Sequence, residues 1–339
     1  MAQALAVKHR PDKFEDVCEQ SSIISILSKQ LEKKEFLNCY LFCGPSGCGK
    51  TTIARIFANK INNGEGSPIE IDGASNNGVD NVKAIIQAAN QRSVDSQYKI
   101  YIIDECHALT NQAWQAFLKC IEEPPMYTIF LFCTTDPQKI PQTILNRVQR
   151  FNLSRISQKA IKKRLKYVCE QEGFTNYDES IDYISKICNG GMRDALAYLD
   201  KAVGYSKNLE ITNVLQALGN YSYYSFFDLT NSMVDGDEKK IVDIIDKFYN
   251  SGNDLKLFVE QYLDFCLDLS KYCLFKDISV TRLPSSLLEE IKYCTAIEGA
   301  KEYFNRLVDK VLEIKNTIKY DSNIRTTILI MLLQFSRGQ

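Results

Sequence analysis

The sequence predicts an α/β domain with a mainly parallel sheet, followed by a small helical domain and an all-helical domain. Helical and strand periodicity alternate along the first part of the chain, and the strand signals fade after Leu153. From Tyr221 onward, apolar residues recur at spacings of three and four. Because 339 residues are too many for one ordinary core, we expect three domains, at 1–154, 155–219 and 220–339.

Short apolar runs and helical patterns define the expected elements of these domains. The strands are expected at residues 38–43, 69–72, 98–104, 128–134 and 148–152. The helices of the first domain are expected at residues 52–61, 79–91, 111–121 and 141–145. The later helices are expected at residues 157–169, with Ser157 as the N-cap, and at 181–188, 192–205, 211–218, 255–272, 300–318 and 324–335.

Composition excludes some classes of protein. The net charge is −1, so bulk charge does not argue for nucleic acid, and any DNA contact must come from a local face. No run of eighteen apolar residues occurs, which predicts a cytoplasmic protein without a membrane partner. The twelve cysteines are scattered without a C-x-x-C pair, and only two histidines accompany them. We therefore expect reduced, mostly buried thiols and no zinc site.

The stretch Gly44-Pro45-Ser46-Gly47-Cys48-Gly49-Lys50-Thr51 fits the phosphate-binding loop pattern at every constrained position. Small residues let backbone N–H groups surround phosphates, and the helix that follows directs a partial positive charge at the same anion. Lys50 is expected to reach the β and γ phosphates, and Thr51 to hold Mg²⁺. A short pattern of this kind can also arise by chance, but the predicted strand before it and helix after it favour a nucleoside triphosphate site.

Polar residues end two further strands. Asp104 and Glu105 follow an apolar strand, which is expected to bring Asp104 beside the loop to hold Mg²⁺ and Glu105 near the attacking water. Thr135, after another strand, is expected to hydrogen-bond the γ phosphate or the water. The alternatives are that the acids cap the next helix and that Thr135 belongs to a turn before Pro137.

Two arginines are candidates for reaching a nucleotide. Arg147 lies between a short helix and the last strand, from which it can project toward a neighbouring subunit. Arg193 begins a helix of the second domain and can reach the nucleotide of its own chain. The alternatives are a surface arginine and a helix-terminal residue paired with Asp194. For His107 we expect a structural role, because phosphoryl transfer depends on placed charges.

Together these strings resemble the AAA+ clamp-loader ATPases, and among them the gamma/tau subunits of bacterial DNA polymerase III. The resemblance is close over about the first 220 residues and weak beyond them. Its most specific parts are Glu122-Glu123-Pro124-Pro125 and Thr134-Thr135-Asp136-Pro137-Gln138-Lys139. Further matching strings are residues 9–14, 44–51, 70–75, 104–109, 117–121 and 191–196.

The resemblance implies an AAA+ domain, a helical lid domain and an oligomerising collar domain, with residues 315–333 the best match to the collar. It implies a Walker A loop at 44–51 with Thr52 also at the nucleotide, Walker B acids Asp104 and Glu105, sensor 1 at Thr135, an arginine finger at Arg147 and sensor 2 at Arg193. It also implies an adenine-binding segment around Arg10, Pro11 and Val17, and DNA-facing positions at Lys119 and Thr143.

Five features depart from the family pattern. The link at residues 60–69 is short and free of cysteine, where relatives usually carry a four-cysteine zinc module, so a short gamma-like form without zinc is expected. The motif around Arg147 is Asn146-Arg147-Val148 in place of Ser-Arg-Cys. The turn at 76–78 lacks basic residues, and Glu19 replaces a small residue before Gln20. We also expect no tau-like extension after residue 339.

The functional hypothesis is an ATP-hydrolysing motor subunit of a clamp loader. ATP and Mg²⁺ are its expected cofactors, and its expected partners are other clamp-loader subunits in a homo- or hetero-oligomer, a pentamer by analogy, together with a sliding clamp and primer-template DNA. Two alternatives remain at this stage. One is a stator subunit that binds ATP without hydrolysing it, and the other is a different AAA+ DNA motor such as a branch-migration helicase.

Overall fold

A computed structural model describes residues 3–219 and 221–338. These residues form two compact units, one made of the chain up to residue 171 together with 188–200, the other of 172–187 together with 201 onward. The expected fold class is confirmed, since a parallel sheet flanked by helices precedes helical regions. The domain boundaries expected at 154/155 and 219/220 stay a prediction.

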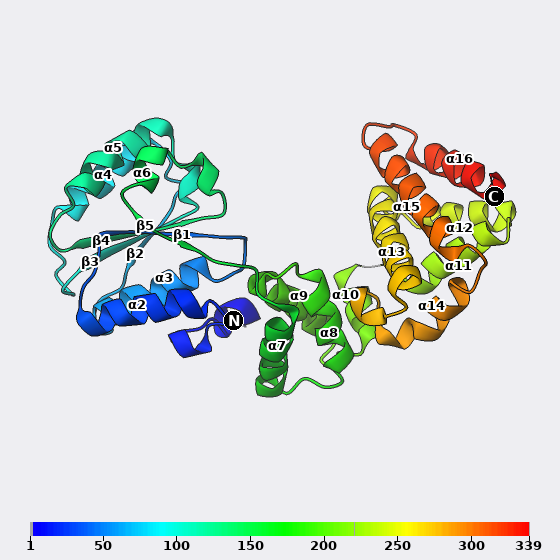
Figure 1. The fold of residues 1–339 in the computed structure, drawn as a ribbon, viewed down its shortest axis with the longest axis horizontal. Coiled ribbons are helices and arrows are strands. Elements are labelled where there is room, and N and C mark those ends of the chain that lie inside the picture. Colours follow the sequence, from blue (N-terminus) through cyan, green and yellow to red (C-terminus); the bar gives the residue numbers. More distant parts are fainter. Residues whose placement is uncertain (1–2, 220, 339) are drawn as a thin grey trace. The chain divides into compact units, whose positions relative to one another are not determined.

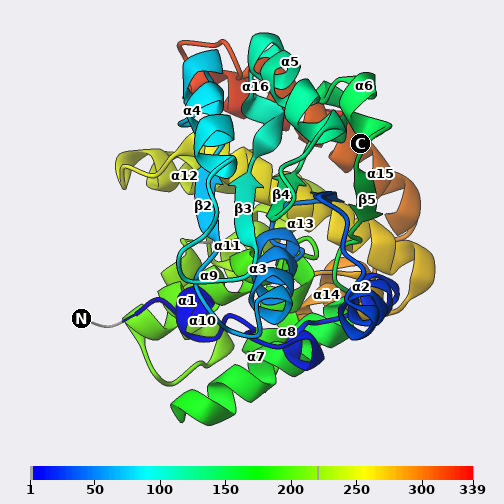
Figure 2. The same cartoon turned by 90° about the vertical axis from the view of Figure 1, so that its left-hand side faces the viewer.

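The first unit contains a five-stranded sheet in the order β2-β3-β4-β1-β5, and every pairing in it is parallel. The strands are β1 (Cys39–Cys43), β2 (Ile69–Asp72), β3 (Lys99–Asp104), β4 (Thr128–Thr134) and β5 (Gln149–Asn152). β1 and β4 are buried along their whole length, while the edge strand β2 is mostly exposed. Figure 2 shows β2, β3 and β4 side by side. Burial on both faces explains why the central strands are continuous apolar runs.

Helices cover both faces of this sheet (Figure 1). α2 (Ser21–Lys33) and α3 (Lys50–Ile61) bury Leu27 and Phe57 against one face. α4 (Val79–Ala89), α5 (Asn111–Glu122) and α6 (Gln142–Leu145) bury Trp114 and Phe117 against the other. Short helices at α1 (Leu5–Lys8), η1 (Phe14–Asp16), η2 (Cys106–Ala108) and η3 (Pro137–Lys139) complete this part. The two cores hold the carboxyl ends of the strands at one edge, where the polar residues gather.

The helices that follow the sheet are α7 (Gln158–Glu172), α8 (Asp178–Ile187), α9 (Met192–Tyr205) and α10 (Ile211–Leu218). Ser157 caps α7 as expected, because its Oγ accepts the Ala160 N–H at 3.2 Å. α3 begins two residues earlier than expected, at Lys50, because the turn of the loop already ends at Gly49.

The remainder of the second unit is helical and has one aromatic-rich core. Its elements are α11 (Tyr223–Val234), α12 (Glu238–Asn250), α13 (Leu255–Phe275), η4 (Ile278–Val280), η5 (Ser285–Leu287), α14 (Leu288–Cys294), α15 (Ala300–Thr317) and α16 (Ile324–Arg337). Phe226 packs against Phe258, Tyr262 and Phe265 with ring centroids 5.5 Å apart in each pair. α11, α12 and α14 are additional to the helices named from the sequence.

Candidate nucleotide-binding site

The loop between β1 and α3 is a tight turn whose shape depends on glycine. Gly49 has a φ of +104°, a conformation that residues with a side chain rarely adopt. A Cβ at Gly47 would lie 3.0 Å from the Cα of Gly191, in the turn before α9. The Met192 N–H donates to the Gly47 carbonyl at 3.0 Å. The loop is therefore packed directly against the start of the helix that carries Arg193.

Lys50 is a buried cation held by neutral groups. Its side chain turns back over the loop, and Nζ donates to the carbonyl oxygens of Gly44 and Pro45 at 2.9 and 2.8 Å. The residue is only 6% exposed. A buried ammonium among neutral acceptors is less stable than one beside an anion, so this position favours binding of an anionic group.

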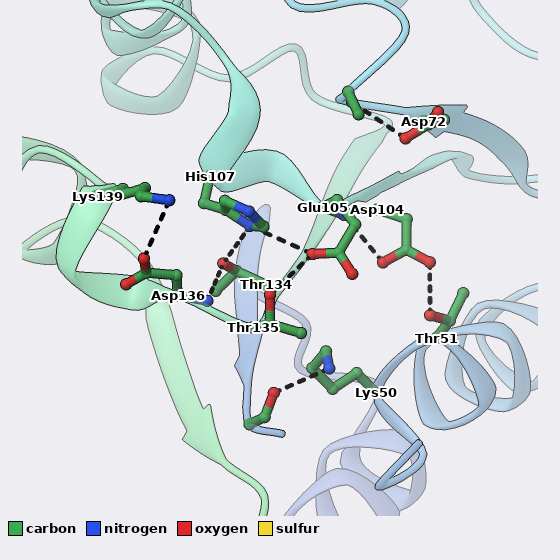
Figure 3. A network of polar contacts seen from close by, with 12 residues as sticks. Lys50, Thr51, Asp72, Asp104, Glu105, His107, Thr134, Thr135, Asp136 and Lys139 are labelled. Carbon is green, nitrogen blue, oxygen red and sulfur yellow. Dashed lines mark hydrogen bonds and ion pairs between the residues drawn. The ribbon is translucent and has the colours of Figure 1, made fainter. Parts of the chain in front are cut away.

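Thr51 and Asp104 meet across the site (Figure 3). Thr51 Oγ1 donates to Asp104 Oδ2 at 2.7 Å, and the Glu105 N–H donates to Asp104 Oδ1 at 3.0 Å. The backbone of Asp104 is held as well, because the Gly73 N–H donates to its carbonyl at 2.7 Å. A Cβ on Gly73 would lie 2.8 Å from that same oxygen, so this approach of β2 and β3 requires glycine.

Glu105 is anchored by residues from two other segments. Its Oε2 accepts from Thr135 Oγ1 at 3.1 Å and lies 3.2 Å from His107 Nδ1. The same His107 nitrogen lies 3.2 Å from Thr134 Oγ1 (Figure 3). Glu105 itself has a φ of +46°, a strained value for a residue with a Cβ. His107 therefore contacts Glu105, the candidate catalytic acid. This contact was not expected from the sequence, which predicted a structural role for the histidine.

These side chains open onto one cavity of about 380 Å³ that lies wholly within the first unit. The predicted residues that line it are Arg10, Pro11, Val17, Ser46, Gly47, Cys48, Gly49, Lys50, Thr51, Thr52, Asp104, Glu105 and Arg193. Gly44 and Pro45 support it through their bonds to Lys50, and Thr135 through its bond to Glu105. The structure thus brings together segments that lie far apart in the chain.

Three charged residues of the cavity were missed by sequence reasoning: Arg55, Glu70 and Arg164. Arg55 forms an ion pair with Glu70, and Arg164 Nη2 donates to the carbonyl of His9 at 2.9 Å. Burial, and then the neighbouring Arg55 guanidinium, lower the pKa of Arg10. Arg55 follows Thr51 by one helical turn, which is the only local signal of its position. Glu70 and Arg164 depend on long-range packing and carry no such signal.

Three of the predicted residues neither line the cavity nor support its lining: Lys119 on α5, Thr143 on α6, and Arg147 just after α6. All three are exposed. Arg147 forms an ion pair with Glu122 at 2.7 Å and donates from Nη1 to the Thr143 carbonyl at 2.8 Å. Their assignment to DNA and to a neighbouring nucleotide stays a prediction.

Within residues 3–219 and 221–338, no group of three or more His, Cys, Asp or Glu side chains is arranged to hold a metal ion. The helices in those same ranges include none that is long and apolar enough to cross a membrane. Mg²⁺ bound together with a nucleotide needs fewer protein ligands than such a cluster provides.

Glu19, the departure noted before Gln20, binds Ser157, the N-cap residue of α7. Its carboxylate accepts from Ser157 Oγ at 2.5 Å and from the Ser157 N–H at 3.0 Å. Next to it, Gln20 exchanges hydrogen bonds with the backbone of Ser154, at 2.8 Å to the carbonyl and 3.3 Å from the N–H. The segment expected to bind adenine is therefore tied to the start of α7. Glu19 adopts a φ of +62°, so these bonds compensate for backbone strain.

We expect Glu19→Ala to lower the free energy of unfolding by about 1 kcal/mol, because it removes two hydrogen bonds and leaves the strain. Glu19→Gly should cost less, since glycine relieves the positive φ. Urea denaturation, monitored by the fluorescence of Trp114, the single tryptophan, measures the stability of the first unit. Glu15→Ala, in the same segment, is the control. Equal midpoints for Glu19→Ala and Glu15→Ala would show that the carboxylate does not support the cap.

Two family models match parts of this chain. Residues 68–157 match the family model described as "DNA polymerase III, delta subunit". Residues 160–208 match the model described as "DNA polymerase III clamp loader subunit, ATPase lid domain". The first match covers β3, which ends at Asp104, and the segment with Arg147, and the second covers the start of α9 with Arg193.

Curated relatives decide the family. The DNA polymerase III subunit gamma of Buchnera aphidicola subsp. Acyrthosiphon pisum is 33% identical over 290 residues, which cover 79% of this chain and 80% of the relative. The chain belongs to the DNA polymerase III gamma/tau family. The tau subunit of Bacillus subtilis is 36% identical over 292 residues, or 80% of this chain and 52% of the relative. The gamma/tau subunit of Mycoplasma genitalium is 29% identical over 334 residues, which cover 90% of this chain and 56% of the relative. This gamma/tau chain spans about half the length of the latter two relatives.

Solved structures extend the comparison to the fold. The chain resembles the RuvB Holliday junction branch migration motor of Thermotoga maritima with a TM-score of 0.52 at 18% identity, covering 66% of this chain and 79% of that one. A variant form of the same protein gives a TM-score of 0.53 at 19% identity, with the same coverage. At this identity the likeness concerns the fold alone, so over the matched part the gamma/tau chain is folded like that motor.

Proposed function

We propose that this chain is an ATP-hydrolysing motor subunit of a loader for a DNA polymerase sliding clamp. The observation that carries the proposal is the convergence of Lys50, Asp104 and Arg193 on one cavity in a chain of the gamma/tau family. A buried cation, an acid at a strand end and an arginine at the start of α9 are the charges that phosphoryl transfer requires. ATP binding closes the assembly on clamp and primer-template DNA, and hydrolysis releases them.

The residues present fit a triphosphate with Mg²⁺. Lys50 exchanges its neutral carbonyl partners for phosphate oxygens, and the backbone N–H groups of the loop at 44–51 surround them. Thr51 and Asp104 present hard oxygen ligands that lie 2.7 Å apart, and they would hold a Mg²⁺ ion, which would neutralise phosphate charge. Arg10, Pro11 and Val17 line the part of the cavity assigned to adenine.

The remaining roles follow from charge and position. Glu105 accepts a proton from the attacking water at its carboxylate, and Thr135 orients that carboxylate. Arg193 stabilises the phosphates of the same subunit, and Arg147 those of a neighbouring subunit. Lys119 and Thr143 contact the DNA backbone, and residues 220–339 join the subunits, with a pentamer expected by analogy.

The proposal is tested by ATP turnover in the assembled complex, with and without clamp and primer-template DNA. We expect Arg147→Ala to lower DNA-stimulated turnover by about 10³-fold or more while ATP binding persists, because a finger arginine acts on the transition state. Arg150→Ala, which removes the next arginine along the chain, is the control.

Full DNA-stimulated turnover by assembled Arg147→Ala would refute the finger assignment. Nucleotide binding without turnover in every assembly of the wild-type chain would instead identify a stator subunit. The intact set Lys50, Thr51, Asp104 and Glu105 argues against that alternative. ATP-driven junction movement in the absence of a clamp would identify a branch-migration motor.

A further inference from the structure

The side chain of Arg147 is not loose on the surface, because two groups of its own subunit hold it. Nη2 pairs with Glu122 Oε1 at 2.7 Å, and Nη1 donates to the Thr143 carbonyl at 2.8 Å. Arg147 and Glu122 remain 39% and 43% exposed. A guanidinium has five N–H donors in a rigid plane, so these two contacts define its orientation and leave donors for a further anion.

Glu122 is itself held in place by a buried helix. It is the last residue of α5, whose other face buries Trp114, Phe117 and Ile121 in the core of the sheet. α5 packs against α6, the helix directly before Arg147. This core fixes the end of α5 that carries Glu122, and the ion pair holds the guanidinium of Arg147 beside it.

The same two helices carry the positions that are assigned to DNA. Lys119 lies three residues before Glu122 on α5, hence on the same face of the helix. Thr143, the other such position, supplies the carbonyl that Arg147 binds. DNA that binds at Lys119 or Thr143 therefore acts on the helix ends that carry Glu122 and the Thr143 carbonyl, the two groups that orient Arg147.

We propose that Glu122 is a positioning residue that orients Arg147 toward the nucleotide of the neighbouring subunit and links DNA contact to hydrolysis there. This inference rests on the proposed function, specifically on Arg147 acting across the subunit interface. Glu122 touches neither nucleotide nor reacting atoms in this scheme. Before assembly, the carboxylate of Glu122 balances the positive charge of Arg147. After assembly, it keeps the guanidinium in the same orientation.

The test compares Glu122→Gln with Glu123→Gln in the assembled, DNA-stimulated complex. Glutamine keeps the size of the side chain but loses the charge that holds the guanidinium. We expect Glu122→Gln to lower kcat for ATP by on the order of ten- to a hundredfold, as a misaligned catalytic group does, with KM unchanged. Glu123→Gln, an exposed neighbouring acid, should match the wild type. The double variant Glu122→Gln/Arg147→Ala should be no slower than Arg147→Ala, because both changes remove one interaction.

A mixed assembly shows on which site Glu122 acts. A subunit with Lys50→Ala cannot turn over ATP itself, yet it still presents Arg147 to its neighbour. Adding Glu122→Gln to that subunit should lower the turnover of the wild-type subunits mixed with it.

Unchanged turnover in this mixture, or equal kcat for Glu122→Gln and Glu123→Gln, would overturn the inference. If Arg147→Ala were also without effect, the proposed finger role would fail as well, whereas an effect of Arg147→Ala alone would overturn only the role of Glu122. Fluorescence of Trp114, on the same helix, verifies that the variants are folded.

Discussion

Lys50→Ala is expected to abolish ATP turnover and clamp loading while the subunits still associate through their helical collar. Lys50 is the buried cation of the loop, with Nζ on the carbonyls of Gly44 and Pro45. Loss of a hydrogen bond from a charged group costs about 1.5–3 kcal/mol, so ATP affinity should fall roughly ten- to a hundredfold. Turnover should fall much further, because the developing charge on the γ phosphate loses its main cation.

Isothermal titration with ATP, an ATPase assay and gel filtration separate these effects. Lys60→Ala is the matched control, because it removes a lysine from the other end of α3, where Nζ lies over the Phe14 ring. It should leave all three measurements close to those of the wild type. Wild-type ATP affinity and turnover in Lys50→Ala would show that the loop does not bind the triphosphate.

Glu105→Gln is expected to keep ATP binding and to stop hydrolysis. Glutamine can still accept the hydrogen bond of Thr135, but it cannot take a proton from water at neutral pH. General-base catalysis contributes about 10² to 10⁴ in rate, and kcat should fall by that factor. The assembly should then accumulate in the ATP-bound state, with clamp and primer-template DNA retained.

Single-turnover ATP hydrolysis and the dissociation rate of labelled DNA measure the two parts of this expectation. Asp72→Asn is the control, because Asp72 pairs in register with Asp104 on the neighbouring strand. The carboxylate of Asp72 accepts hydrogen bonds only from Ala74 and Ser75 of its own turn among the contacts described. A Glu105→Gln protein that hydrolyses ATP at the wild-type rate would assign the general base to another group. His107, 3.2 Å from the same carboxylate, is then the first residue to examine.

Much of the nucleotide site was predictable because its signals are local. The loop at 44–51 is one contiguous string, and the glycines it requires are visible without any tertiary context. Asp104 and Thr135 could be assigned because the ends of parallel strands meet at one edge of a sheet. That rule places Asp104 at the end of β3 beside Thr51, and the structure gives 2.7 Å between their oxygens.

Other features had no local signal. Arg164 enters the cavity from α7, and Glu70 from the edge strand β2, because of how α7 and the sheet pack. Glu19 was visible only as an odd residue before Gln20, and its partner Ser157 is 138 residues away. The pair of Glu122 with Arg147 likewise joins the ends of two helices that no spacing rule connects.

The class of fold, the phosphate loop, the acids at the strand ends and the family resemblance could all be predicted from the order of the residues. Each of these depends on periodicity or on a contiguous motif, whose local structure is determined by short-range sterics and hydrogen bonding. The folded chain was needed to show the strand order, the partners of Lys50, Glu105 and Arg147, and the hydrogen bonds between Glu19 and the start of α7. Those depend on which distant surfaces pack together, because burial of apolar side chains such as Trp114 and Phe57 brings polar groups side by side that the chain keeps far apart.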